Sequence, residues 1–156
     1  MINVSISGFA DLTITDVIFD YNGTLAVDGI LIAGVDKLLT TLARKLKIHV
    51  VTGDSLGTAK KELTGIPCTV HIVPSLEQGL AKQQYLQQLN AKNTIAIGNG
   101  RNDRQIMHDT AIGILILGTE GASVHALKEA DILVANIFDA INLLEHPGRL
   151  LATLRS

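Results

Sequence analysis

The chain has 156 residues, of which 47% are hydrophobic, 18% are charged and only 3% are aromatic. A chain of this length can bury the core of one domain of ordinary size, so we expect residues 1–156 to form a single domain. The formal net charge of −2 leaves no basic stripe, and few aromatic side chains can stack on bases, so nucleic acid is not an expected partner.

Apolar runs alternate with segments of helical periodicity along the chain. Alternating apolar and polar residues on either side of Gly8 predict an N-terminal β-hairpin, and Leu25–Ile32 predicts a second hairpin around Asp28-Gly29. Strands are predicted at 16–20, 48–52, 69–73, 94–97, 112–117 and 131–134. Helices are predicted at 35–46, 55–63, 76–89, 102–110, 123–130 and 137–155. This alternation predicts an α/β fold with three layers, in which helices cover both faces of a parallel, Rossmann-like sheet.

The composition also predicts the make-up of the core and the cellular compartment. The core must consist of Ile, Leu, Val and Ala, which suits a parallel sheet buried on both faces. Cys68 is the only cysteine, so no intramolecular disulfide can form. Met1–Ala10 lacks the pattern of a signal peptide, and the longest apolar run, Ala111–Leu117, is too short to cross a bilayer. We therefore expect a soluble cytoplasmic protein with no membrane partner.

Asp20 follows the apolar run Val17-Ile18-Phe19 and precedes the turn Tyr21-Asn22-Gly23-Thr24. The turn would leave the Asp20 carboxylate at the carboxyl end of a buried strand, where open α/β sheets bind ligands. A carboxylate in this place can attack phosphorus and form an aspartyl-phosphate. Because Asn-Gly is also an ordinary turn dipeptide, this segment alone leaves both interpretations open.

Thr52 and Gly53 end the next central strand, and a helix is predicted to start at Ser55. The Thr52 hydroxyl and the free N–H groups of that helix could donate to phosphoryl oxygens. The alternative is an ordinary helix cap by Asp54 or Ser55.

Lys82 and the Gly-rich segment Gly98–Asp103 supply a cation and several oxygen ligands. Lys82 lies early in a predicted helix and could neutralise phosphate charge, although such a lysine is usually solvated. The segment Gly98–Asp103 carries Asn99, Asn102 and Asp103 between a strand and a helix, and such hard oxygen ligands suit Mg²⁺. By contrast, the five histidines show no zinc-ligand spacing and are expected at the surface or in the core.

The order and spacing of these segments resemble those of the haloacid dehalogenase (HAD)-like phosphohydrolases. The matching motifs are Asp-x-x-Gly-Thr at Asp20, Thr-Gly-Asp at Thr52, a lysine at Lys82, and Gly-x-Gly-x-Asn-Asp at Gly98. Val51–Asp54, Gly98–Asp103 and Gly118–Ile132 are similar to the phosphorylation domain of P-type ATPases in particular. The resemblance covers roughly Val17–Val134, and the chain looks like a soluble, stand-alone relative of that domain.

The resemblance implies a role for each of these residues. Asp20 would be the phosphorylated nucleophile. The phosphoryl group would be held by Thr52, Gly53, Lys82 and Asn102. The cofactor would be Mg²⁺, bound by Asp20, the Asn22 backbone carbonyl, Asn99 and Asp103.

The chain departs from the family pattern at two positions. Asn22 stands where the phosphatases have an aspartate that protonates the leaving group and activates water. Losing such a general acid–base typically costs about 10²–10⁴-fold in rate. Asn99 stands where the family usually has a metal-binding aspartate, so we expect weak binding of Mg²⁺. The P-type ATPases also lack the first aspartate, which accompanies an aspartyl-phosphate that persists.

Neither gap between the motifs has room for a cap domain. Thr24 and the helix at Val35 are separated only by a hairpin, and Thr52 and Lys82 only by one βα unit. Capless members of the superfamily often self-associate or act on bulky substrates. The apolar hairpin segment Ile30-Leu31-Ile32 could therefore be a homo-oligomer interface or a flap over its own sheet.

The sequence thus predicts a slow, Mg²⁺-dependent phosphatase that acts through an aspartyl-phosphate on a phosphorylated small molecule or a phosphoprotein. The main alternative is a phosphate-binding or regulatory module that acts through a protein partner with little turnover. A small-ligand-binding α/β domain without phosphate chemistry is a third, weaker interpretation.

Overall fold

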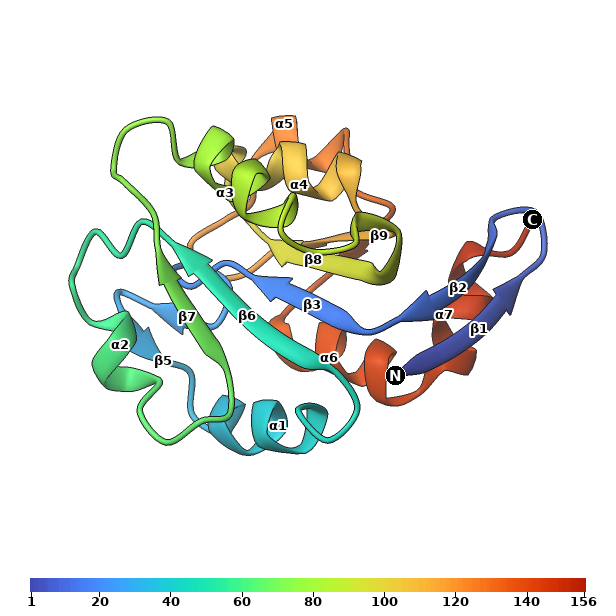
Figure 1. The fold of residues 1–156 in the computed structure, drawn as a ribbon, viewed down its shortest axis with the longest axis horizontal. Coiled ribbons are helices and arrows are strands. Elements are labelled where there is room, and N and C mark those ends of the chain that lie inside the picture. Colours follow the sequence, from blue (N-terminus) through green and yellow to red (C-terminus); the bar gives the residue numbers. More distant parts are fainter.

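The computed structural model describes residues 1–156 and contains a six-stranded, fully parallel central sheet (Figure 1). Its strands are β3 (Asp16–Phe19), β6 (Lys47–Thr52), β7 (Thr69–Ile72), β8 (Thr94–Gly98), β9 (Ile112–Ile116) and β10 (Ile132–Val134). They lie in the order β10-β9-β8-β3-β6-β7, so β3 is central and its two neighbours are β6 and β8. The predicted α/β class and parallel sheet are confirmed.

Helices cover both faces of this sheet. Figure 1 shows α3 (Gln78–Leu86), α4 (Arg104–Asp109) and α5 (Val124–Leu127) on one face and α1 (Val35–Leu42) and α6 (Ile137–Glu145) on the other. The remaining helices are α2 (Ala59–Glu62), α7 (Pro147–Leu154) and two short 3₁₀ turns at Ala91–Asn93 and Arg101–Asp103. None of these helices is both long and apolar enough to span a bilayer.

The apolar strands fill two separate cores, one on each face. Along β3, Val17 and Phe19 point into the larger core under α1 and α6, whereas Ile18 points into the smaller core under α3, α4 and α5. Val50 and Val51 of β6 divide in the same way. This alternation follows from the two-residue period of a strand, and it explains why the buried strands read as continuous apolar runs.

Both predicted hairpins are present. β1 (Ile2–Ile6) pairs with β2 (Ala10–Ile14), and Figure 1 shows this hairpin beside α7, away from the central sheet. β4 (Ala26–Val27) pairs with β5 (Ile30–Leu31) between β3 and α1, so no cap domain lies there. The second hairpin folds back onto the body of the protein, because Leu31 packs against the larger core, whereas Asp28 of the turn and Ile30 of β5 are exposed.

The observed helices are shorter than predicted, and two of them differ most from the prediction. The helix predicted at 55–63 is shortened to Ala59–Glu62, because Asp54 and Gly57 take positive φ angles of 44° and 67° and form a loop before it. The helical tail predicted at 137–155 is two helices, since Pro147 lacks an N–H group and begins a new helix after His146. The first difference removes the predicted helix N-terminus at Ser55.

Candidate active site

A small, polar pocket opens at the carboxyl ends of the three central strands β3, β6 and β8. Its volume is about 200 Å³, and no hydrophobic residue lines it. The lining residues are Asp20, Asn22, Thr52, Gly53, Asp54, Ser55, Gln78, Asn99, Gly100 and Asn102. The pocket therefore contains six of the eight predicted site residues, and the other two, Lys82 and Asp103, lie buried next to Asp20.

Lys82 connects the two buried carboxylates of the site. Its Nζ atom donates to Asp20 Oδ1 at 2.7 Å and to Asp103 Oδ1 at 2.6 Å. Lys82 is 1% exposed, Asp103 0% and Asp20 7%, so water screens these charges little. The usual alternative for a helical lysine, a solvated side chain, is thereby excluded.

The charges in this cluster shift the pKa values of its members. The pKa of Asp20 is raised to about 6, chiefly because burial penalises the carboxylate; Asp103 raises it too, and Lys82 opposes both. Burial lowers the pKa of Lys82, but the charges of Asp103 and Asp20 outweigh this effect and leave the pKa above its ordinary value. Lys82 therefore stays protonated. When Asp20 is ionised, two carboxylates face one ammonium group, and the excess negative charge favours a further cation.

Asp103 has partners for both of its oxygens inside the protein. Oδ1 accepts from Lys82, and Oδ2 accepts from the backbone N–H groups of Asn99 at 3.2 Å and Gly100 at 2.9 Å. Asp103 does not line the pocket. Its carboxylate thus holds Lys82 and the Gly98–Asp103 turn in place.

Thr52 ends β6 at the pocket wall and is 2% exposed. Its Oγ1 accepts from the Asp54 backbone N–H at 3.1 Å, which leaves the hydroxyl proton available to a ligand. Asp54 Oδ1 accepts from the backbone N–H groups of Thr58 and Ala59, both at 3.0 Å. The Asp54 side chain therefore caps the start of α2, whose N-cap residue is Thr58, so its capping role is that of the alternative interpretation, but for a helix that begins later than predicted.

The two asparagines that replace family aspartates both line the pocket. Asn22 Oδ1 is buried and has no hydrogen-bond partner. Asn99 donates through Nδ2 to the Gly121 carbonyl at 3.0 Å, and its Oδ1 lies 3.4 Å from the Thr24 hydroxyl. Gly23 permits this approach, because a Cβ atom there would lie 2.2 Å from Asn99 Nδ2.

These oxygens fit a hard divalent cation such as Mg²⁺, which accepts one or two carboxylates together with carbonyl oxygens and water. No group of three or more His, Cys, Asp or Glu side chains gathers anywhere in the chain. A cation here would have the carboxylates of Asp20 and Asp54 and the unpartnered Asn22 oxygen in the pocket wall, with Asp54 Oδ1 already bonded to two backbone N–H groups. This set of oxygen donors is compatible with Mg²⁺, but it carries little negative charge.

Gln78 belongs to the site but was not predicted. Its Oε1 accepts from Asn102 Nδ2 at 2.7 Å, and its side chain lies so close to Gly53 that a Cβ atom there would be 2.4 Å from Nε2. A glutamine at the start of a polar helix gives no signal of its own. The adjacent Gly79 is a weak signal, since it lets α3 approach the Asn102 backbone, where a Cβ atom at Gly79 would lie at 3.4 Å.

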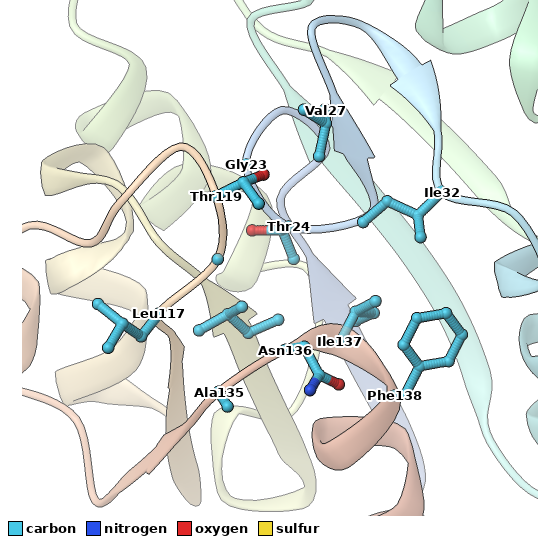
Figure 2. A pocket seen from close by; sticks show the side chains of 12 residues that line it. Gly23, Thr24, Val27, Ile32, Leu117, Thr119, Ala135, Asn136, Ile137 and Phe138 are labelled. Atoms are coloured by element: carbon cyan, nitrogen blue, oxygen red, sulfur yellow. The ribbon is translucent and has the colours of Figure 1, made fainter.

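A second cavity of about 400 Å³ lies on the other side of the Gly23–Thr24 turn and is mainly apolar (Figure 2). Val27 and Ile32 of the β4–β5 hairpin, Leu117 after β9 and Phe138 of α6 contribute to its wall. No charged residue and none of the eight predicted site residues lines it. It therefore offers no charged side chain to a phosphoryl group or a metal ion.

Comparisons of sequence identify two relatives in Methanocaldococcus jannaschii, while no family model matches the chain. The uncharacterized protein MJ0073 is 40% identical over 80 residues, which are 49% of this chain and 86% of that protein. A soluble P-type ATPase-like phosphatase is 28% identical over 125 residues, which are 77% of this chain. The chain spans only 45% of the length of this second relative.

Solved structures match over nearly the whole chain. The cobalt-bound deoxy-D-mannose-octulosonate 8-phosphate phosphatase (YrbI) from Haemophilus influenzae has a TM-score of 0.71 at 13% identity, covering 92% of this chain and 90% of that one. The 3-deoxy-D-manno-octulosonate 8-phosphate phosphatase from Moraxella catarrhalis, in complex with magnesium, phosphate and KDO, has a TM-score of 0.67 at 13% identity, covering 91% and 94%. The chain therefore belongs to one family with MJ0073, and it has the capless fold of the HAD-like hydrolase superfamily.

Proposed function

We propose that this protein is a Mg²⁺-dependent phosphohydrolase that forms an aspartyl-phosphate on Asp20. The observation that carries this proposal is the buried Lys82 ammonium group, 2.7 Å from the Asp20 carboxylate beside a polar pocket. Such an ammonium group, sheltered from water, can stabilise the charge of phosphoryl oxygens that approach the carboxylate. The fold and the phosphatases among the similar proteins support the same class of reaction.

In this proposal the pocket positions the phosphoryl group and the chain supplies most of its charge partners. Lys82 contacts Asp20 Oδ1, so the other carboxylate oxygen can attack phosphorus while Lys82 stays in place. The Thr52 hydroxyl, the Gly53 N–H and the Asn102 amide donate to the phosphoryl oxygens. Asp103 serves the reaction by holding Lys82.

Mg²⁺ would be held by Asp20, the Asn22 backbone carbonyl, Asn99 and Asp103. When bound, it neutralises charge on the phosphoryl oxygens. Because Asn99 contributes a neutral oxygen where the family usually has a carboxylate, we expect weaker affinity than in a site with that additional carboxylate.

Asn22 determines which substrates this site can use well. An amide cannot protonate a leaving group, so esters of poorly acidic alcohols would react slowly, whereas acyl and aryl phosphates need no such proton. We therefore infer an activated phosphate on a small molecule or a protein as the substrate class.

The test is phosphate release from acetyl phosphate and an aryl phosphate, with and without Mg²⁺, beside an Asp20→Asn control. Asp20→Asn is nearly isosteric and keeps an acceptor for Lys82, so it removes the nucleophile and little else. Metal-dependent release that Asp20→Asn abolishes supports the aspartyl-phosphate route. Equal release by both proteins would contradict it.

The second candidate function is a phosphate-binding regulatory module, and the neutral Asn22 and Asn99 favour it. The Asn22→Asp variant separates the two functions. If the site is otherwise assembled, hydrolysis should rise on the order of 10²-fold or more, because a general acid–base is restored. No gain, with phosphate binding retained, would favour the module.

A further inference from the structure

We propose that Gln78 is a catalytic residue that orients the water molecule for hydrolysis of the aspartyl-phosphate, a role that rests on the proposed function. The site needs such a residue because Asn22 cannot accept a proton from water. A glutamine can orient an attacking water without taking its proton, as in the GTPases. Gln78 is in the position to do this, for three reasons that the structure supplies.

The first reason is its contacts. Gln78 joins the two loops that carry Gly53 and Asn102, both proposed to hold phosphoryl oxygens. Its Oε1 accepts from Asn102 Nδ2 at 2.7 Å, and its amide group packs directly over Gly53. A side chain that touches both of these groups lies at the edge of the space that the phosphoryl group would fill.

The second reason is the hydrogen-bonding capacity that remains on Gln78. A carbonyl oxygen has two lone pairs, so Oε1 can accept from water while it still accepts from Asn102. The only hydrogen bond of Nε2 is a long one of 3.4 Å to the Ser75 carbonyl. Nε2 can therefore donate to a phosphoryl oxygen or to the water.

The third reason is that Gln78 is less tied to the protein than several other polar side chains in or beside the pocket. Asp54 Oδ1 accepts from two backbone N–H groups at the start of α2. Asn99 Nδ2 donates to the Gly121 carbonyl. Lys82 is held by two carboxylates and donates only. Among the lining residues, Gln78 combines a free donor, a free lone pair and a long side chain.

The step balances without a base. The water oxygen forms a bond to phosphorus while the bond between phosphorus and the Asp20 oxygen breaks, and that electron pair returns to the carboxylate. Both water protons stay on the released phosphate, which leaves as dihydrogen phosphate and then equilibrates with solvent. Gln78 orients the water and gains or loses no proton.

The experiment labels the 156-residue chain with radiolabelled acetyl phosphate and Mg²⁺, removes the reagent, and follows the loss of label from Asp20. We expect Gln78→Ala to become labelled as readily as the wild type and to lose the label on the order of 10- to 100-fold more slowly. This is less than the 10²–10⁴-fold typical of a general acid–base, because no proton is transferred to Gln78.

Gln83→Ala is the matched control, since Gln83 lies on the same helix but donates to Asp109 at 2.7 Å, away from the pocket. It should lose label at the wild-type rate. Hydroxylamine, a strong nucleophile that needs no orientation by Gln78, should remove the label equally fast from all variants. Thermal melting of both variants reports any general loss of structure.

Gln78→Glu distinguishes catalysis from a merely structural contact. Glutamate keeps an acceptor for Asn102 and adds a base, so its loss of label should be faster than that of Gln78→Ala and should increase as the carboxylate ionises, around pH 4–5. Loss of label from Gln78→Ala at or above the wild-type rate would overturn the role of Gln78. Absence of label on wild-type Asp20 would instead overturn the proposed function, and this inference with it.

Discussion

A buried aspartate lies at each end of strand β3, and each belongs to a polar cluster that includes a side chain of α3. Asp20, just after its carboxyl end, contacts Lys82 of α3 at 2.7 Å. Asp16, at its amino end, contacts His49 Nε2 at 2.9 Å, and His49 Nδ1 contacts the hydroxyl of Tyr85, also on α3, at 2.8 Å. The two clusters share a strand and a helix, yet only the first borders a polar pocket.

The difference teaches what makes a buried polar cluster a site. In the Asp16 cluster the partners satisfy one another, with Thr15 donating to Asp16 at 2.6 Å and His71 stacking on Tyr85 at 4.8 Å. In the Asp20 cluster the charges do not balance, and the adjacent Asn22 oxygen has no partner. The first arrangement is satisfied within the fold, whereas the second leaves an excess negative charge and an unpaired oxygen beside a pocket, which is what the proposed function uses.

The largest effect should come from Lys82→Met, which removes the cation from between two carboxylates. We expect at least about 10³-fold slower phosphate release, since the charge that faces the phosphoryl group is lost. We also expect the free energy of unfolding to fall by about 3–5 kcal/mol, because two buried carboxylates lose their partner. Urea unfolding and acetyl phosphate assays measure both. If Lys82→Met were as stable and as active as the wild type, the Asp20 cluster would not differ in function from the Asp16 cluster.

An intermediate effect should come from the pH dependence of stability in the presence of a chelator. The pKa of Asp20 is raised to about 6, above the ordinary carboxyl value, so the folded state binds the proton more tightly than the unfolded chain. This contribution to stability is present below about pH 4 and is lost as the pH rises towards 6.

Asp20→Asn removes this group, so its unfolding free energy should decline less than that of the wild type between pH 4 and pH 7. The difference should be roughly 1–3 kcal/mol, and urea titrations across this range would measure it. Parallel pH profiles for the two proteins would show that folding does not raise the pKa of Asp20.

The smallest effect should come from Tyr85→Phe in the other cluster. Removing the hydroxyl leaves the buried Nδ1 of His49 without its partner, which should cost about 1–2 kcal/mol of unfolding free energy. Phosphate release should stay within about 3-fold of the wild type, because no atom of this cluster borders the pocket. A much larger loss of activity would mean that Tyr85 positions Lys82 through α3.

Most of the fold and most of the pocket could be predicted from local pattern. Apolar runs and helical periodicity located the sheet, and the motifs after β3, β6 and β8 indicated residues that share one pocket. The prediction worked because consecutive carboxyl ends of parallel strands meet at one edge, so short-range sequence signals report a long-range arrangement. The prediction of a helix from Ser55 was wrong, because the loop at Ser55–Thr58 depends on a side-chain cap by Asp54 and on positive φ angles.

The sequence alone thus determined the fold class, the pair of hairpins and the kinds of side chain at the sheet edge. Only the tertiary structure decided that Lys82 is buried between Asp20 and Asp103, that the Asn22 oxygen lacks a partner, and that Gln78 reaches Asn102. The physical reason is that the burial and the hydrogen bonds of a side chain depend on how several segments, distant in the sequence, pack around it. No single segment encodes that packing. His49 shows the same limit, since only its contacts separate a structural histidine from a functional one.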